Sequence, residues 1–83
     1  METYLLIARS VTQAQHMAHV LENCGIRAAL LRTPAGLTNR GCSYAVRIRA
    51  GQWVAASSCL QKAELRPLGI FQRDNSGYRE VIT

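Results

Sequence analysis

The stretch "TYLLIARSVTQAQHMAHVLENCG", residues 3–25, decides the fold because it holds the signals for a strand, a helix start and a helix end. Its opening, "TYLLIA", is an apolar run of strand length. The residues "SVTQ" match a capping box, in which Ser10 is the N-cap and Gln13 reaches back to it from the third helical position. Gly25 stands where a helix end favours a left-handed residue. The stretch therefore predicts a strand over residues 3–8 and a helix over residues 11–24.

Apolar residues at helical spacing predict two amphipathic helices. The buried stripe of the first consists of Ala14, Met17, Ala18 and Leu21. A second helix over residues 52–64 has a stripe of Trp53, Ala56, Leu60 and Ala63. The residues expected in the core are Met17, Leu21, Trp53 and Leu60.

Four further segments are predicted as strands. One covers residues 27–33, and another is "YAVRIR", residues 44–49, which alternates apolar positions with Ala45, Arg47 and Arg49. Residues 68–73 and 78–83 flank "DNSG", a hairpin turn sequence. The order is β-α-β-β-α-β with an extra C-terminal strand, in a single domain over residues 1–83. This predicts an α+β, ferredoxin-like domain whose antiparallel sheet is covered on one face by two helices.

Length and composition predict one globular domain without a membrane segment. The chain has 83 residues, 48% of them hydrophobic, and no apolar run approaches the ~20 residues that cross a bilayer. The opening lacks the basic leader and cleavage site of a signal peptide. The three cysteines include no C-x-x-C pair. They favour free thiols in a reducing cytoplasm over a disulfide framework or a structural metal site.

The charge of the chain permits an anionic partner but does not specify one. The formal net charge is +5 and the sequence pI is about 9.7, a balance that suits anionic partners. The basic residues are scattered, without a Lys/Arg run or an aromatic-rich RNA-recognition signature, so nucleic-acid binding is disfavoured. For Arg47 and Arg49, solvation of one sheet face is favoured over capture of an anionic ligand.

The loop "PAGLTNRGCS", residues 34–43, places Cys42 between two predicted strands. Nearby cations stabilise the reactive thiolate form of a cysteine. Arg40 stands two residues earlier and Arg47 lies in the next strand, while Gly41 permits a tight backbone. Pro34 shapes the loop without chemistry of its own. The alternative is a loop cysteine that acts as a small hydrophobe with no role.

The same segment resembles the Se/S carrier protein-like family of small, mostly bacterial domains. The matching residues are Thr33, Pro34, Leu37, Thr38, Cys42 and Arg47. The preceding "YLLIARSVTQAQHMAHVLENCGI" is similar to the family's opening, and the resemblance covers residues 4–69. One departure stands beside the cysteine: the family usually has glycine directly after it, where this chain has Ser43, with Gly41 before it.

The resemblance implies a carrier that holds a sulfur or selenium atom on Cys42, as a persulfide in the sulfur case. A cysteine desulfurase or a selenium-handling protein is the implied donor, and another protein the acceptor. The supporting residues are Thr33, Pro34, Arg40, Gly41, Ser43 and Arg47. No cofactor and no metal are expected, and a stoichiometric carrier or binding module is favoured over an enzyme.

Other chemistry-bearing residues are interpreted as structural. Cys24 and Cys59 fall on the margins of their helices' apolar stripes and are expected to pack. His16 and His19 project toward solvent without a third ligand nearby in the sequence, so metal binding is disfavoured. The five acidic residues fall in separate elements, which disfavours general acid–base catalysis.

Two other function classes remain open: a small protein-binding or regulatory module, and an RNA or acidic-partner binder. The first strand is apolar on both faces, so helices on one face leave either Leu5 and Ile7 or Tyr4 and Leu6 on the other. An exposed apolar patch of this kind marks an interface. A homodimer through this face or through the late hairpin is therefore expected.

Overall fold

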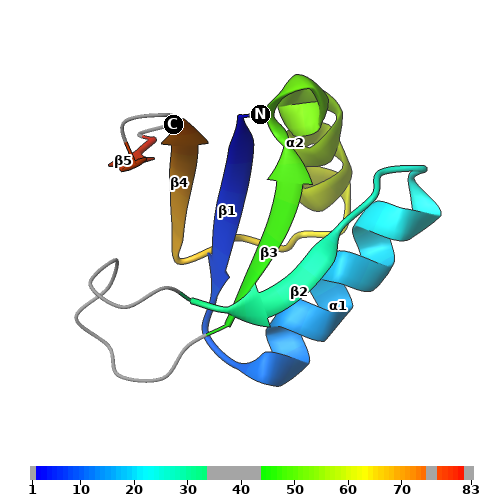
Figure 1. Ribbon diagram of the computed structural model, residues 1–83. Helices are drawn as coiled ribbons and strands as arrows, with labels where there is room; N and C mark the ends of the chain where they lie inside the picture. The colour runs from blue at the N-terminus through cyan, green and yellow to red at the C-terminus, as the bar shows by residue number, and fades with distance from the viewer. Residues whose placement is uncertain (1, 34–43, 75–76, 82–83) are drawn as a thin grey trace.

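The computed structural model describes residues 2–33, 44–74 and 77–81. Five strands and two α-helices follow one another along the chain (Figure 1). In order, the elements are β1 (Thr3–Ala8), α1 (Val11–Asn23), β2 (Ala29–Arg32), β3 (Tyr44–Arg49), a 3₁₀ turn η1 (Ala50–Gln52), α2 (Trp53–Lys62), β4 (Gly69–Asp74) and β5 (Gly77–Glu80). The predicted element order is therefore confirmed within these ranges.

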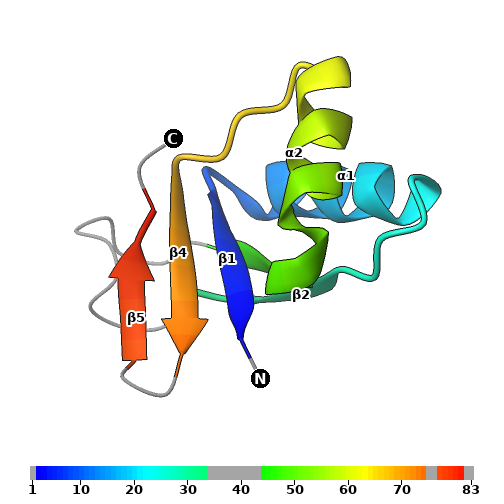
Figure 2. The ribbon, with the colours of Figure 1, turned by 90° about the horizontal axis from the view of Figure 1, so that it is seen from above.

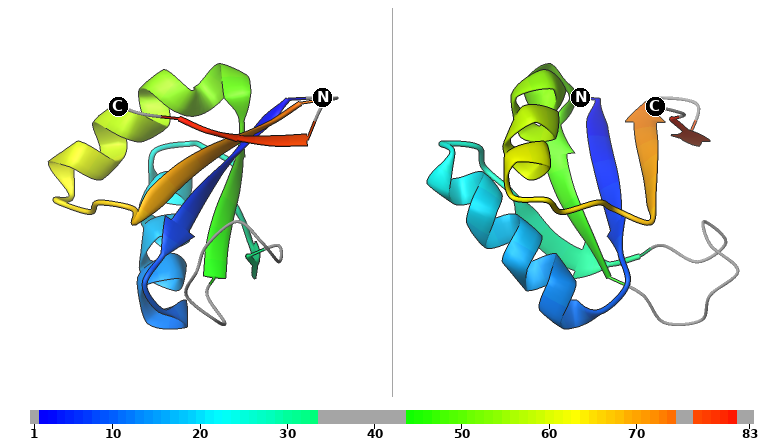
Figure 3. Two further views of the ribbon diagram at one scale, coloured as in Figure 1. Left: turned by 90° about the vertical axis from the view of Figure 1, so that its left-hand side faces the viewer. Right: turned by 180° about the vertical axis from the view of Figure 1, so that it is seen from behind.

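The strands form one antiparallel sheet in the order β2-β3-β1-β4-β5. Figure 3 shows both helices on the same face of this sheet. Figure 2 shows β4 and β5 at one side of the molecule, away from the helices. The α+β class is confirmed, and the order β2-β3-β1-β4 is compatible with the ferredoxin-like arrangement, with β5 added beside β4.

The start of α1 is built by the residues that the capping box predicts, with one difference. The Gln13 backbone N–H donates to Ser10 Oγ at 3.1 Å. The Gln13 side chain accepts from the backbone N–H of Arg9 at 2.6 Å, one residue before the expected N-cap donor. At the other end, Gly25 has a φ of +81°, as the left-handed termination requires. Both helix ends are therefore local features of the sequence.

Replacing Ser10 with alanine should lower the free energy of unfolding by about 1 kcal/mol, because the N-cap hydroxyl satisfies an otherwise unpaired helix N–H. Urea denaturation followed by circular dichroism measures the change. Replacing Ser10 with aspartate is the matched control, since its carboxylate caps equally well and also faces the positive end of the helix dipole. If the alanine and aspartate variants unfold at the same urea concentration, the cap contributes nothing.

The main core lies between the helices and the sheet. Met17 and Leu21 are fully buried, and Leu60 is 3% exposed, which confirms their predicted positions. The buried residues that complete this cluster are Leu6, Ala8, Ala14, Ile26, Val46, Ile48, Ala56 and Cys59. Trp53 differs from the prediction: it is only half-buried and packs at the edge of the cluster. Its ring stacks on Tyr4, with centroids 5.2 Å apart.

A second, smaller cluster lies on the face of the sheet opposite the helices. Leu5 and Ile7 are each 1% exposed and Ala45 is fully buried, with Leu31 and Phe71 packed against them. The expected exposed apolar patch on β1 is therefore wrong, because both faces of this central strand are covered. The argument for a homodimer through this face loses its basis, whereas a homodimer through the late hairpin stays a prediction.

Strand and helix lengths depend on what each element can pair with. The predicted strand over residues 27–33 is shorter, Ala29–Arg32, because its ladder ends where Arg32 pairs with Tyr44, the first residue of β3. The second helix begins at Trp53, after the 3₁₀ turn, and ends at Lys62; Glu64 has a φ of +59°. The late hairpin is shifted and shorter, and Arg79 forms a 3.5 Å ion pair with Asp74 across it.

Candidate functional site

The loop predicted to carry the chalcogen, residues 34–43 (the carrier loop), follows β2 and precedes β3, and these two strands pair with each other. Arg32, the last residue of β2, lies opposite Tyr44, the first residue of β3. The segment between them therefore starts and finishes side by side at one end of the sheet. Five predicted site residues lie outside the described residues: Pro34, Arg40, Gly41, Cys42 and Ser43. Thr33 and Arg47 are described.

Thr33 stands at the root of this segment, directly after β2. Its Oγ1 is buried and has no hydrogen-bond partner. A buried hydroxyl without a partner costs about 1–3 kcal/mol, so such groups are uncommon in folded proteins. The predicted supporting position Thr33 therefore presents an unused donor and acceptor at the base of the loop.

Arg47 lies in β3, the strand that follows the loop segment. It is the fourth residue of β3 and is exposed on the face opposite the helices. Its Cα is about 10 Å along the strand from Tyr44, at the usual strand rise. Arg47 also lines a hollow of about 260 Å³, together with Thr3, Arg27, Ala29, Ile48 and Arg49.

Arg27 is the residue that sequence reasoning missed at this end of the sheet. The ladder pairs Ala29 with Arg47, and continuing that register by two residues places Arg27 beside Arg49. The signal was present in the sequence only as two arginines in separate predicted strands. Without the register, nothing indicated that they are neighbours.

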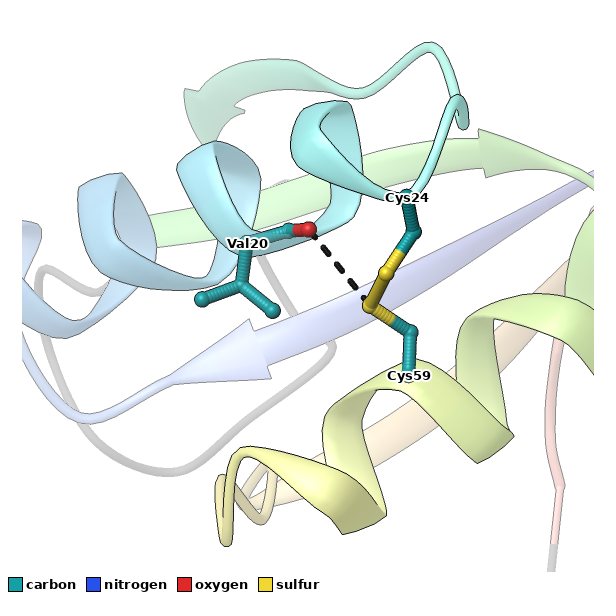
Figure 4. The surroundings of a disulfide bond; sticks show 3 residues. All are labelled: Val20, Cys24 and Cys59. Carbon is teal, nitrogen blue, oxygen red and sulfur yellow. Dashed lines mark hydrogen bonds between the residues drawn. A yellow bond between two sulfur atoms is a disulfide. The ribbon is translucent and has the colours of Figure 1, made fainter.

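Cys24 and Cys59 are joined by a disulfide, with an S–S distance of 2.05 Å and Cα atoms 6.6 Å apart (Figure 4). The expectation of free thiols is therefore wrong for these two residues. Cys24 is exposed at the C-cap of α1, whereas Cys59 is 7% exposed in α2, so only Cys59 packs in the core as predicted. The bond ties the end of one helix to the middle of the other.

The sulfur of Cys59 also lies close to a backbone acceptor. Its Sγ is 3.4 Å from the carbonyl oxygen of Val20 in α1 (Figure 4). A disulfide sulfur carries no hydrogen, so this contact becomes a hydrogen bond only when the disulfide is reduced and Cys59 is a thiol. The same position is thus compatible with both oxidation states.

The remaining candidates show no assembled site. His16 and His19 are exposed on α1. In residues 2–33, 44–74 and 77–81, no group of three or more His, Cys, Asp or Glu side chains is placed to hold a metal ion. Neither helix, nor any other in those ranges, has the length and apolar character needed to span a bilayer.

The fold and these positions define a class: a small α+β domain with a cysteine-bearing segment between the edge strand β2 and its neighbour β3, and an internal disulfide between its helices. A model of the family described as "Putative Se/S carrier protein-like" matches residues 3–72. The chain belongs to this family, and the resemblance found in the sequence is confirmed. Comparison with curated proteins and with solved structures gave no match.

Proposed function

We propose that this protein carries a sulfur or selenium atom on Cys42 for transfer to a partner protein. The observation that carries the proposal is the Cys24–Cys59 disulfide, in a chain that belongs to the Se/S carrier protein-like family. The chain has three cysteines, and the disulfide uses two of them. The third is Cys42, the cysteine on which the family resemblance rests. In the oxidised protein no second thiol of the same chain competes with it for a chalcogen.

The proposed loading step is a thiol exchange at a sulfane atom. The Cys42 thiolate attacks the outer sulfur of a donor persulfide, R–S–SH. The S–S bond of the donor breaks, R–S⁻ leaves, and a Cys42 persulfide forms. With a donor selenopersulfide, R–S–SeH, the same exchange leaves selenium on Cys42. The electron pair of the broken bond departs with the donor thiolate, so no external oxidant or reductant is required.

Delivery to the acceptor is the same exchange in reverse direction. An acceptor thiolate attacks the outer atom on Cys42, and the Cys42 thiolate is released. Each cycle returns the protein unchanged, so it acts as a stoichiometric carrier. A cysteine desulfurase or a selenium-handling protein is the proposed donor.

The residues around Cys42 are assigned supporting roles in this proposal. Arg40, two residues before the cysteine, supplies the cation that stabilises the thiolate. Thr33 offers its unpaired hydroxyl at the root of the loop. Gly41 and Ser43 flank the cysteine in the sequence, and we propose that their small size leaves its sulfur accessible to a partner. Arg47, in the strand that follows the loop, is the second proposed cation, and it also lines the hollow farther along β3.

Incubating the oxidised protein with a cysteine desulfurase and L-cysteine should add one sulfur atom, detected by intact mass spectrometry. With L-selenocysteine the gain should be one selenium atom. Treatment with a thiol reductant should remove either adduct, as expected for a persulfide or selenopersulfide. Peptide mapping should place the adduct on Cys42.

Two variants make the loading test specific. Replacing Cys42 with serine should abolish the adduct while leaving the fold unchanged. Replacing Cys24 with serine and Cys59 with alanine removes the disulfide, and this variant should still load at Cys42. Absence of an adduct on the folded wild-type protein, or an adduct that persists in the Cys42→Ser variant, would contradict the carrier proposal and favour a binding module without chemistry.

A further inference from the structure

Three arginine side chains line one hollow at the end of the sheet away from the carrier loop. Arg47 and Arg49 are two residues apart on β3, so both side chains stand on the face opposite the helices. Arg49 lies opposite Thr3 on β1, and Arg27 lies beside Arg49 in the continued β2–β3 register. We name this set the arginine hollow: Thr3, Arg27, Arg47 and Arg49, around a space of about 260 Å³.

Within the part of the chain that the structure describes, no carboxylate forms an ion pair with the three arginines of the hollow. All three are exposed, and among the described residues the ion pair that forms is Arg79–Asp74, at the late hairpin. Arg73, which lies opposite Thr3 on β4, adds a fourth guanidinium to this face and sits 5.8 Å from the ring centroid of Tyr78. Like charges gathered on one face of the sheet repel one another, so an anion bound among them would relieve that repulsion.

Polar atoms inside the same region have no partner. Thr3 Oγ1 is buried, lines the hollow and makes no hydrogen bond. A second hollow of about 300 Å³ shares Arg27 and Arg49 and is bounded by Gln52. The Oε1 of Gln52 is also buried without a partner, and rotation of its amide by half a turn presents the –NH₂ group instead. A hydroxyl and an amide are thus available to donate beside the guanidinium groups.

We propose that the arginine hollow binds a small, multiply charged oxyanion of the phosphate class. Guanidinium groups bind phosphate oxygens through paired, charge-assisted hydrogen bonds. Arg27 and Arg49 form one pair of cations in the continued β2–β3 register, and Arg47 lies two residues earlier on β3, opposite Ala29. Thr3 donates its hydroxyl to the same anion from the neighbouring strand. Two hollows that share Arg27 and Arg49 suit an anion with two linked charged groups, such as pyrophosphate.

A compact ligand fits these observations better than a nucleic acid. Single-stranded nucleic acid is bound along extended basic grooves with stacking aromatic side chains. Here Thr3 and the three arginines line one hollow, and Gln52 lies at a second hollow that shares Arg27 and Arg49 with the first. The aromatic pair Tyr4–Trp53 is stacked on itself, with Trp53 against the helix-side core. The ligand is therefore inferred to be a small oxyanion.

The proposal does not depend on the chemistry of Cys42. The loop joins β3 at Tyr44, whereas the hollow lies at Arg47 and Arg49, toward the other end of the strand. Anion binding should therefore be unchanged in the Cys42→Ser variant, and failure of chalcogen loading would leave the inference untouched.

A titration of the full chain with pyrophosphate, followed by amide NMR chemical shifts, tests the inference. We expect saturable one-to-one binding, with the largest shifts at Thr3, Arg27, Ala29 and Arg49. Replacing Arg49 with glutamine should weaken binding roughly ten- to hundredfold, since hydrogen bonds to charged groups are the strong class. Replacing Thr3 with valine keeps the shape and removes the hydroxyl, and should weaken binding about three- to tenfold.

The matched control is Arg79→Gln, which removes the same charge from an exposed position at the late hairpin, away from the hollow. It should bind pyrophosphate as the wild type does. Equal weakening by Arg79→Gln and Arg49→Gln would overturn the inference in favour of diffuse charge. Tighter binding of a single-stranded oligonucleotide, with shifts that extend to Arg66 and Arg79, would overturn it in favour of a nucleic-acid surface. Absence of saturation at millimolar pyrophosphate would also overturn it.

Discussion

Removing the Cys24–Cys59 disulfide should lower the free energy of unfolding by about 4 kcal/mol. The two cysteines are 35 residues apart in the sequence, and closing a loop of that length restricts the unfolded chain. Small domains have a total stability of about 5–15 kcal/mol, so this one bond contributes a large share. The measurement is urea denaturation of the Cys24→Ser, Cys59→Ala variant beside the oxidised wild type.

Reduction without mutation should cost less than the double substitution. The reduced Cys59 keeps its volume in the core, and its thiol can donate to the carbonyl oxygen of Val20, 3.4 Å away. The alanine in the variant fills less space and donates nothing. A Cys42→Ser variant is the control for the reductant, because it retains the disulfide and should lose the same stability on reduction as the wild type. If reductant left the wild-type midpoint unchanged, the disulfide would not form in solution.

Replacing Leu21 with alanine should destabilise the domain by about 2–5 kcal/mol, because the truncation leaves a cavity in the core. Leu21 is fully buried in the helix-side cluster. Its carbonyl also accepts the backbone N–H groups of Cys24 and Ile26 at 3.0 Å, at the end of α1. The cavity therefore forms near the end of α1, beside the residue that carries the disulfide and in the cluster that packs on the sheet. Urea denaturation followed by tryptophan fluorescence measures it, since Trp53 packs against the same cluster.

Val54→Ala is the matched control for that substitution. Val54 lies in α2 and is 81% exposed, so its truncation should change the free energy of unfolding by no more than about 0.5 kcal/mol. Leu60, 3% exposed on the same helix, should behave like Leu21 when truncated. Equal effects of Leu60→Ala and Val54→Ala would show that the helix faces the sheet with a different side.

Local signals in the sequence were sufficient for the elements whose stability is decided by neighbouring residues. The bounds of β1 and β3 agree with the prediction, and α1 begins at Val11 as the capping box requires. Helix capping involves residues within about one turn, and strand alternation repeats every second residue. The family resemblance arose from the same kind of local pattern, around Thr33 and Cys42. These features can therefore be inferred from short segments of the sequence.

Long-range pairing decided what the sequence alone did not determine. Cys24 and Cys59 appeared as two separate packing residues, and only the docking of α1 on α2 brought their sulfurs together. The covering of Leu5 and Ile7 likewise depends on Leu31 and Phe71 from other strands.

The candidate sites also differ in whether local signals or long-range pairing define them. The α+β class, both helices, the central strands and the family of the chain could be inferred from its sequence. The disulfide, the covered second face of β1 and the arginine hollow became visible only in the folded chain, where strand register brings Thr3, Arg27 and Arg49 together. The two groups of features differ in how far apart in the sequence the interacting residues are. Capping and alternation are settled between residues a few positions apart, whereas a disulfide or a shared hollow needs segments brought together by burial of the whole core.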